Sequence, residues 1–153
     1  MRRILLVNGP NLAALGERQP EIYGAATLTD IEAAVTRRGA ALGAEVHCVQ
    51  SNHEGALVDA LEARRATADG CIINPGGLSH TSVVLADALR AFGKPVIEVH
   101  LSNIFAREAY RRVSLCAEAA VAVISGLGAH GYTVALESLV TMLEGRSIRE
   151  NAT

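Results

Sequence analysis

The sequence predicts an α/β fold in which five parallel strands form a sheet with helices on both faces. Five short apolar runs alternate along the chain with longer amphipathic segments, which is the order of a repeated β-α unit. Strands that are joined through a helix lie parallel, because the helix returns the chain to the same end of the sheet. The length of 153 residues is that of one domain, so we expect a single domain over 1–153.

The predicted strands are rich in valine, isoleucine and leucine, as strands buried on both faces of a parallel sheet are. They are RILLVN (3–8), AEVHCVQ (44–50), GCIIN (70–74), PVIEVH (95–100) and AVAVIS (120–125). Each run is far shorter than the roughly 20 apolar residues that cross a membrane as a helix. We therefore expect no contact with a membrane.

The amphipathic segments between these runs predict helices. The first extends from about Thr27 to near Leu42, because Thr27 and Asp30 resemble a capping box and Gly43 is a typical stop. Four more are expected over about 54–66, 81–92, 106–112 and 132–143, of which the piece at 106–112 is short. No repeat interrupts this order.

Composition limits the partners and the compartment. A net charge of −2 supplies no basic surface for nucleic acid, whereas 50% hydrophobic residues and a mean hydropathy of +0.24 favour a homo-oligomer that covers apolar surface. The three thiols, Cys48, Cys71 and Cys116, form no C-x-x-C pair and indicate small core residues in a reducing compartment. We expect a cytoplasmic protein.

Polar and glycine-rich residues follow four of the predicted strands. They are Asn8-Gly9-Pro10-Asn11, 51–54, 74–81 and 100–103. Parallel sheets bind ligands outside the carboxyl ends of their strands, so we interpret these four segments as one pocket rather than as four separate turns. The glycine- and proline-containing stretch from Gly9 to Gly24 is long for a plain connector and favours a functional loop.

Two charged motifs are candidates for chemistry. Strand alternation places Glu98 and His100 on one face, where a carboxylate can hold an imidazole protonated. The pair is either a general acid or a structural ion pair, and its place at the ligand edge favours the acid. Arg107 and Arg111 lie four apart on one face of the expected helix, so Arg111 either points to solvent or binds an oxygen-rich ligand.

Other motifs exclude some chemistries. GLGAHG, at 126–131, matches G-x-G-x-x-G, but no second strand with an acidic end follows it, so close strand-to-helix packing explains its glycines better than a dinucleotide site. The one lysine, Lys94, precedes the fourth strand at the edge opposite the polar residues, which disfavours a Schiff base. The five histidines are dispersed, so we expect no metal site.

Taken together, the motifs resemble those of type II 3-dehydroquinate dehydratase. They are LLVNGPNL, G-x-R-x-P-E-I-Y-G, QSNHEG, NPGGLSHTS, IEVHLSN, ARE-x-x-RR-x-S and GAHGY, in this order along nearly the whole chain. The resemblance implies a flavodoxin-like three-layer fold and a homododecamer of four trimers. It also implies a single catalytic domain that converts 3-dehydroquinate to 3-dehydroshikimate without a cofactor.

The resemblance implies catalytic roles for five residues. Tyr23 would be the base that takes a proton from the carbon next to the ketone. Arg18, in a lid loop at about 17–24, would stabilise the tyrosinate, and Asn11 would help to stabilise the enolate. His100 would protonate the departing hydroxyl, with Glu98 holding it in its acidic state.

The resemblance also implies substrate-binding roles. The carboxylate would be bound by Asn74 and by the backbone amides of Leu101 and Ser102, while ring hydroxyls would be bound by His80 and Arg111. Asp87 matches an aspartate that reaches the site of a neighbouring subunit.

Some residues depart from the family pattern, and some questions stay open. Gln19, Ala13, Ala14 and Ala86 differ from the residues usual at these places, which bears on loop kinetics and affinity more than on the reaction. One alternative is a flavodoxin-like module that binds a small molecule or a phosphate without chemistry. Another is a lyase that forms an imine, which would need Lys94. The sequence fits either a biosynthetic role or quinate breakdown.

Overall fold

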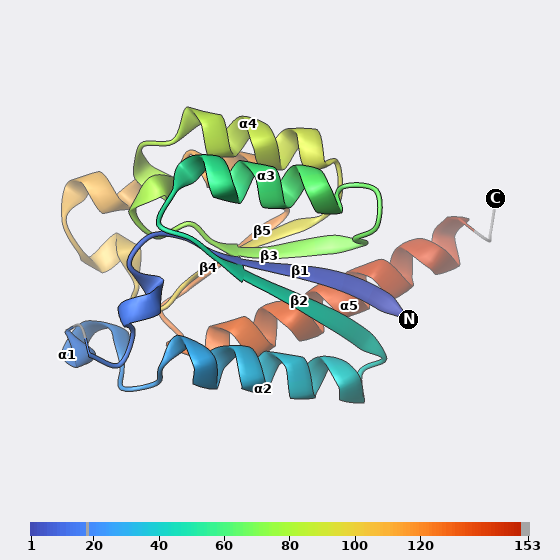
Figure 1. Ribbon diagram of the computed structural model, residues 1–153, viewed down its shortest axis with the longest axis horizontal. Helices are drawn as coiled ribbons and strands as arrows, with labels where there is room; N and C mark the ends of the chain where they lie inside the picture. Colours follow the sequence, from blue (N-terminus) through green and yellow to red (C-terminus); the bar gives the residue numbers. More distant parts are fainter. Residues whose placement is uncertain (18, 151–153) are drawn as a thin grey trace.

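A parallel five-stranded sheet lies between two layers of helices in the computed structural model (Figure 1). The structure describes residues 1–17 and 19–150, with the backbone alone for 146–150. The strands are β1 (Arg2–Asn8), β2 (Ala44–Gln50), β3 (Gly70–Asn74), β4 (Val96–His100) and β5 (Ala122–Ser125), in the spatial order β2-β1-β3-β4-β5. This is the flavodoxin-like order, so the predicted fold class is confirmed.

Two helices cover each face of the sheet. Figure 1 shows α3 (Glu54–Arg64) and α4 (Val83–Phe92) on one face and α2 (Leu28–Ala41) and α5 (His130–Glu150) on the other. A one-turn helix, α1 (Pro20–Tyr23), lies in the loop between β1 and α2. Five 3-10 turns complete the described residues: η1 (Leu12–Ala14), η2 (Gly76–His80), η3 (Ile104–Ala106), η4 (Ala109–Arg112) and η5 (Cys116–Ala119).

Strand alternation divides the apolar side chains between two cores. Ile4 and Leu6 of β1 face α2 and α5, whereas Leu5 and Val7 of the same strand face α3 and α4. All four side chains are buried, as the apolar composition of the strand predicted. The same alternation decides which face each polar residue at the strand ends will meet.

The predicted boundaries of the regular elements agree with the structure to within a few residues, apart from the last helix. The capping box is present, since the Thr27 hydroxyl accepts from the Asp30 amide and the Asp30 carboxylate accepts from the Thr27 amide. The third predicted helix begins two residues later than expected, because Ser82 caps α4 by accepting from the Leu85 amide. The last helix, α5, is longer than its apolar pattern indicated.

The prediction of a short helix around 106–112 is wrong. The backbone there forms two separate 3-10 turns, η3 and η4, with extended residues Arg107 and Glu108 between them. Arg107 and Arg111 therefore do not share a helical face. The extended backbone turns the Arg107 side chain inward toward Tyr23 and Ser102, and Glu108 accepts from Arg111 instead.

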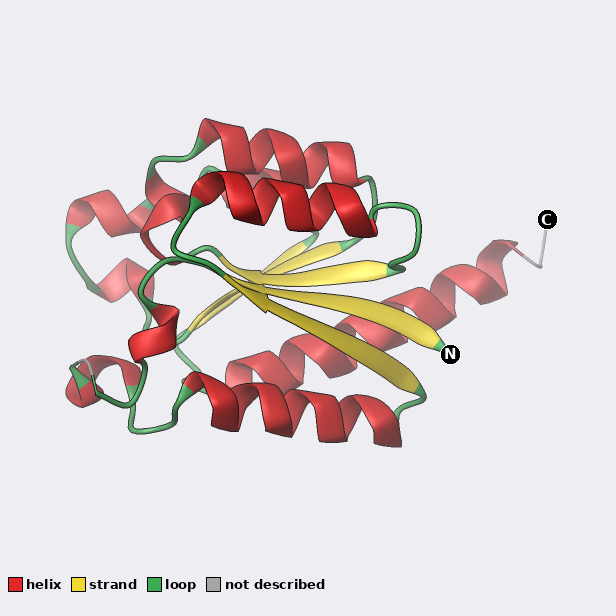
Figure 2. Ribbon diagram, viewed as in Figure 1, coloured by secondary structure: helices red, strands yellow, loops and turns green. Residues whose placement is uncertain are grey.

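Loops and short turns gather at the carboxyl ends of the strands, where α1, η2, η3 and η4 lie, whereas tight connections lie at the opposite edge (Figure 2). The carboxyl-end edge is therefore where irregular backbone presents polar groups.

No helix in the described part of the chain is long and apolar enough to cross a membrane.

Candidate active site

A pocket of about 170 Å³ lies at the carboxyl ends of β1, β3 and β4. Eight of the residues predicted from the sequence line it: Asn11, Tyr23, Asn74, His80, His100, Leu101, Ser102 and Arg111. They come from the last residues of β3 and β4 and from the segments that follow β1, β3 and β4, so the sheet topology brings them together. The pocket also contains Arg107, to which the sequence assigned no role.

The loops after β1 and β3 lie against each other through their backbones. A Cβ on Gly9 would lie 2.4 Å from the Pro75 carbonyl oxygen, and a Cβ on Gly76 would lie 3.0 Å from the Pro10 carbonyl oxygen. Only glycine permits the first approach, and Gly76 also has a positive φ of 61°. These contacts set the distance between the two loops that carry Asn11 and Asn74.

A buried carboxylate–imidazole pair lies at the pocket, with His100 in its lining and Glu98 behind it. Glu98 is fully buried, and its Oε2 lies 3.2 Å from Nε2 of His100, which is nearly as buried. Although this distance is short, the ring N–H is not directed at the carboxylate, so the contact is not a hydrogen bond. The Ser114 hydroxyl, at 2.8 Å and 3.0 Å from the two Glu98 oxygens, supplies the hydrogen bond instead.

The tautomer of His80 follows from its partner. Its Nδ1 lies 2.7 Å from the Val113 carbonyl oxygen, which can only accept, so Nδ1 carries a proton. The Nε2 atom is then free to accept a hydrogen bond from a hydroxyl group. The His80 and His100 rings are nearly parallel, with centroids 6.4 Å apart, so the two imidazoles lie along one wall of the pocket.

Asn8 and Asn74 lie side by side at the ends of β1 and β3, where strand pairing places them in register. Both side chains face α5, and both contact the fully buried Tyr132 hydroxyl. The Asn74 Oδ1 atom also accepts from the Gly76 amide at 3.1 Å. The Asn74 side chain is thus held from two sides within the pocket wall.

Asn11 is held in a backbone conformation that is unusual for a residue with a side chain. Its φ of 69° is in the left-handed region, which asparagine tolerates better than most residues. The Asn52 Oδ1 atom accepts from the Asn11 amide at 3.0 Å, and Gln50 donates both to that oxygen and to the Gly9 carbonyl. The segment after β2 therefore supports the loop after β1.

Tyr23 contacts an arginine that is 84 positions away along the chain. The Arg107 Nη1 atom donates to the Tyr23 hydroxyl and to the Ser102 hydroxyl, each at 3.1 Å, and its guanidinium carbon lies 5.3 Å from the centre of the Tyr23 ring. Sequence reasoning missed this role. The signal was present in the A-R-E motif, but the expected helix directed attention to the spacing from Arg111.

Glu108 lies between the two arginines of this segment. Its carboxylate lies 2.8 Å from Arg111 and 3.7 Å from Arg107. A hydrogen bond to its own backbone amide lowers the pKa of Glu108, and Arg111 lowers it further, so the carboxyl group is ionised at neutral pH. One carboxylate therefore balances two guanidinium groups, and the segment keeps a net positive charge beside the pocket.

Two of the predicted site residues in the described part of the chain do not line the pocket. Glu98 lies behind His100, as the strand pattern predicted. Asp87 lies on the surface of α4, where its side chain is 66% exposed and pairs with Arg90 at 3.2 Å. Arg18 lies outside the described residues.

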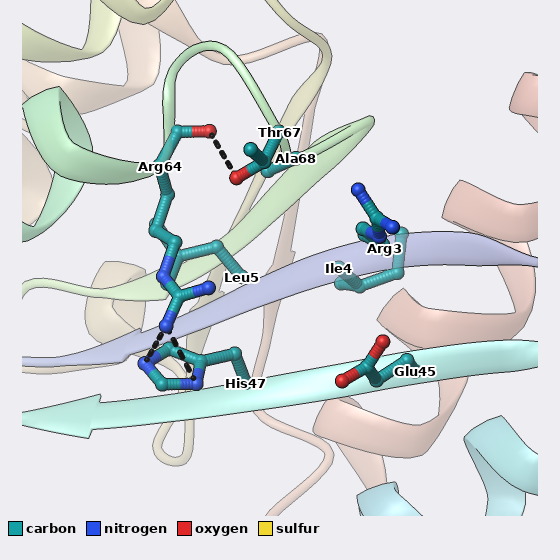
Figure 3. Close-up of a pocket in the computed structure, with 8 residues that line it drawn as sticks. All are labelled: Arg3, Ile4, Leu5, Glu45, His47, Arg64, Thr67 and Ala68. Atoms are coloured by element: carbon teal, nitrogen blue, oxygen red, sulfur yellow. Dashed lines mark hydrogen bonds between the residues drawn. The ribbon is translucent and has the colours of Figure 1, made fainter.

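A second pocket, of about 250 Å³, lies at the opposite edge of the sheet (Figure 3). Figure 3 shows Arg64 reaching from the end of α3 to His47 on β2, whereas Glu45, nearer the start of β2, lies across from Arg3 on β1. The side chains of Arg3, Glu45 and His47 are exposed to solvent. None of the described residues that line this pocket is a buried charged group.

The described residues contain no group of three His, Cys, Asp or Glu side chains that could hold a metal ion. The three thiols are free and lie in or against the cores. Burial raises the pKa of Cys48 to about 11 and that of Cys116 to about 12, and it also raises the pKa of Cys71. At neutral pH the thiols are therefore protonated packing residues, as the sequence suggested.

Comparison with known proteins is consistent with the motifs. The chain matches the model of the family "Dehydroquinase class II" over residues 2–140. It is 53% identical over 140 residues to the 3-dehydroquinate dehydratase of Corynebacterium glutamicum, which covers 92% of this chain and 97% of the relative. It is 48% identical over 147 residues to the catabolic 3-dehydroquinase 1 of Neosartorya fischeri, with 96% and 98% covered.

A solved structure shows the same fold. The crystal structure of the type II dehydroquinase from Propionibacterium acnes superposes with a TM-score of 0.89 at 39% sequence identity. The similarity covers 92% of this chain and 97% of the other.

Proposed function

The chain belongs to the class II dehydroquinase family, and from this premise we propose that it is a 3-dehydroquinate dehydratase, a lyase that works through an enolate. The observation that carries the proposal is that two candidate proton-transfer groups, Tyr23 and His100, line one pocket. Tyr23 accepts a hydrogen bond from Arg107, and His100 has Glu98 behind it.

Tyr23 is the base in this mechanism. A tyrosinate accepts a proton from the carbon next to the ketone, and the electrons of that C–H bond form the enolate. The guanidinium of Arg107 donates to the Tyr23 oxygen, so it stabilises the anionic form of the side chain. We propose the same role for Arg18, on the resemblance alone.

His100 is the acid. As the enolate collapses, the carbon–oxygen bond to the C1 hydroxyl breaks, and the imidazolium donates its proton so that water leaves. Glu98 favours the charged imidazole because it is a buried carboxylate 3.2 Å away. Tyr23 is left protonated and His100 neutral, so a proton must return from the tyrosine to the histidine, directly or through solvent, before the next turnover.

The remaining lining residues bind the substrate. We assign the carboxylate to Asn74 and to the backbone amides of Leu101 and Ser102, and the ring hydroxyls to Arg111 and His80. The Nε2 atom of His80 suits this role, because its partner at Nδ1 leaves that atom free to accept. Asn11 would stabilise the enolate oxygen.

The assembly would be a homododecamer of four trimers. Val83 and Val84 on α4 are 61% and 54% exposed, and Tyr110 and Val113 are also exposed. Exposed apolar side chains of this kind favour burial against another subunit. Asp87 lies on the same helix, so a neighbour that covers α4 would receive its carboxylate, as we propose.

We also propose that the enzyme works in the cytoplasm. The three free thiols suit a reducing compartment, because two of them are fully buried core residues and none is paired.

The test is to add 3-dehydroquinate to the pure protein and to follow the absorbance of the conjugated enone product. We expect product formation by the wild-type chain and by Lys94→Arg at equal rates. The absence of an absorbance change across a range of pH would contradict the proposal and favour a binding module. A covalent adduct on Lys94 after borohydride treatment with substrate would instead favour an imine mechanism.

A further inference from the structure

We propose that Tyr132, held by Asn8, is a positioning residue that fixes the side-chain amide of Asn74 so that one of its N–H groups faces the bound substrate. The inference rests on the proposed function of Asn74 as a carboxylate ligand. It concerns two buried side chains to which that mechanism assigns no part. The argument follows the direction of three consecutive hydrogen bonds.

The first hydrogen bond fixes how the Asn74 amide is turned. The Gly76 backbone N–H lies 3.1 Å from Asn74 Oδ1, and a backbone N–H can only donate. The oxygen of the amide must therefore face Gly76, and the nitrogen must face the other way. No choice of amide orientation is left at Asn74.

The second and third hydrogen bonds follow from the first. Asn74 Nδ2 lies 2.8 Å from the Tyr132 hydroxyl and has only hydrogens to offer, so the tyrosine oxygen accepts. The phenolic proton then donates to Asn8 Oδ1, at 2.7 Å. Burial raises the pKa of the Tyr132 hydroxyl, so the proton that this bond requires stays in place at the pH of any assay.

The network leaves one hydrogen of Asn74 without a protein partner among the described residues. Tyr132 takes one of the two Nδ2 hydrogens, and the second has no acceptor in the hydrogen bonds of the described part of the chain. Asn74 lines the pocket, where only about 3% of its surface is exposed. A substrate oxygen in the pocket is the partner that would satisfy this hydrogen.

The network includes one buried N–H group whose burial costs free energy. Asn8 Nδ2 is buried and has no hydrogen-bond partner among the described residues. Turning the Asn8 amide over would present two donors to the tyrosine oxygen and leave the phenolic proton without Asn8 as its acceptor. The direction of the hydrogen bonds that begins at Asn74 therefore decides the orientation of the Asn8 amide, even though an N–H of Asn8 is left unpaired among the described residues.

The Tyr132 side chain does more than pack in the core, because its hydroxyl holds the Asn74 amide in place. Without its hydroxyl, Asn74 would keep only the 3.1 Å bond to Gly76, and the carboxamide could turn about its terminal torsion. The Asn74 N–H that had donated to Tyr132 could then also donate to solvent or substrate oxygens. No single orientation of the amide would then be held toward the substrate. Loss of the hydroxyl should therefore weaken substrate binding through Asn74 and leave proton transfer at Tyr23 and His100 unchanged.

The experiment is a double-mutant cycle of Tyr132→Phe and Asn74→Ala, with Thr141→Val as the loss of an exposed hydroxyl on the same helix. We expect Tyr132→Phe to raise KM for 3-dehydroquinate about 3- to 10-fold, with kcat within about twofold. In the Asn74→Ala background it should have no further effect on KM. Thr141→Val should leave both constants unchanged. Equal effects of Tyr132→Phe in the two backgrounds would overturn the inference.

Two additions keep the test decisive. If Tyr132→Phe does not fold, Asn8→Ala removes the acceptor of the phenolic proton and should raise KM less, again only when Asn74 is present. Crystal structures of the wild type and the variant report the Asn74 carboxamide directly, whether or not 3-dehydroquinate is the substrate. A turned or disordered amide is expected, and an unchanged one would contradict the inference. Lack of turnover by the wild type would instead count against the proposed function.

Discussion

Two pockets of this molecule lie at opposite edges of one sheet and differ in where their charged groups lie. The pocket at the amino ends of the strands has exposed Arg3, Glu45 and His47 around it (Figure 3). The pocket at the carboxyl ends is lined by the buried His100, which has the fully buried Glu98 behind it. A third pocket, of about 730 Å³, shares Tyr23 and Arg107 with the carboxyl-end pocket, so the largest of the three volumes lies at that edge too.

Burial of a charge costs free energy unless a partner is present, so a buried ionisable pair indicates a requirement other than stability. Exposed charges such as Arg64 beside His47 are screened by solvent and contribute little to stability or to chemistry. The comparison teaches that desolvated proton-transfer groups distinguish the candidate site from the other edge of the sheet.

The largest effect is expected for Tyr23→Phe. The variant keeps the ring beside Arg107 but removes the oxygen that would accept the proton, so we expect kcat to fall by about 10⁴-fold. Steady-state kinetics with 3-dehydroquinate would measure this, with Thr141→Val, the loss of an exposed hydroxyl outside the pocket lining, as the control. Appreciable turnover by Tyr23→Phe would remove the base from the carboxyl-end pocket and weaken the contrast between the two edges.

His100→Ala should lower kcat by about 10³-fold, because the leaving hydroxyl would depart without an acid. Since a general acid contributes mainly in the transition state, KM should change little. The opposite result, a raised KM with kcat intact, would make His100 a binding residue. Glu98 would then be a buried ion pair of the structural kind.

Arg107→Ala and Arg111→Ala sharpen the comparison within the carboxyl-end pocket. Arg107→Ala removes the charge-assisted hydrogen bond to Tyr23, which should raise the activation barrier by about 1.5 to 3 kcal/mol and so lower kcat about 10- to 100-fold. The rising limb of the pH–rate profile should also move to higher pH. Arg111→Ala should mainly raise KM. Equal pH profiles for Arg107→Ala and the wild type would show that Arg107 does not stabilise the tyrosinate.

Arg18→Ala tests the cation that the resemblance assigns to the same role. We expect its pH–rate profile also to move upward, by less than in Arg107→Ala if the two guanidinium groups share the stabilisation. A slower enzyme with the wild-type pH dependence would assign Arg18 to closure of the loop and not to the tyrosinate.

The smallest effects are expected at the amino-end pocket. Arg64→Ala removes the contact with His47, yet the exposed surroundings predict a change in unfolding free energy within about 0.5 kcal/mol. Turnover should equal that of the wild type, which thermal unfolding and kinetics on the same preparation would check. A loss of activity here would break the comparison, because it would give this edge a role in the reaction.

The sequence was sufficient wherever the information is local. Alternation in IEVH placed Glu98 and His100 on one face, and Thr27 with Asp30 marked the start of a helix, because neighbours along the chain decide both features. The pocket edge followed from strand order alone. These predictions needed no knowledge of packing.

The parts that the sequence did not predict depend on contacts between distant segments. Arg107 meets Tyr23 only because the chain near residue 107 is extended and not helical, which no local pattern indicated. The Ser114 hydroxyl donates to Glu98 from the segment before η5, and the Tyr132 hydroxyl donates to Asn8 from α5. In each case the partner lies at least 16 positions away, and tertiary structure alone decides the pairing.

The backbone contact between Gly9 and Pro75 has a consequence for redesign of the pocket. Because main chain meets main chain there, the width of the opening between the β1 and β3 loops does not depend on which side chains line it. Exchanging Asn11 or His80 would change what the pocket can bind chemically but not the thickness of the molecule it admits. An engineer who wants a bulkier substrate must alter the loops themselves, since even one methyl group at position 9 would force them apart.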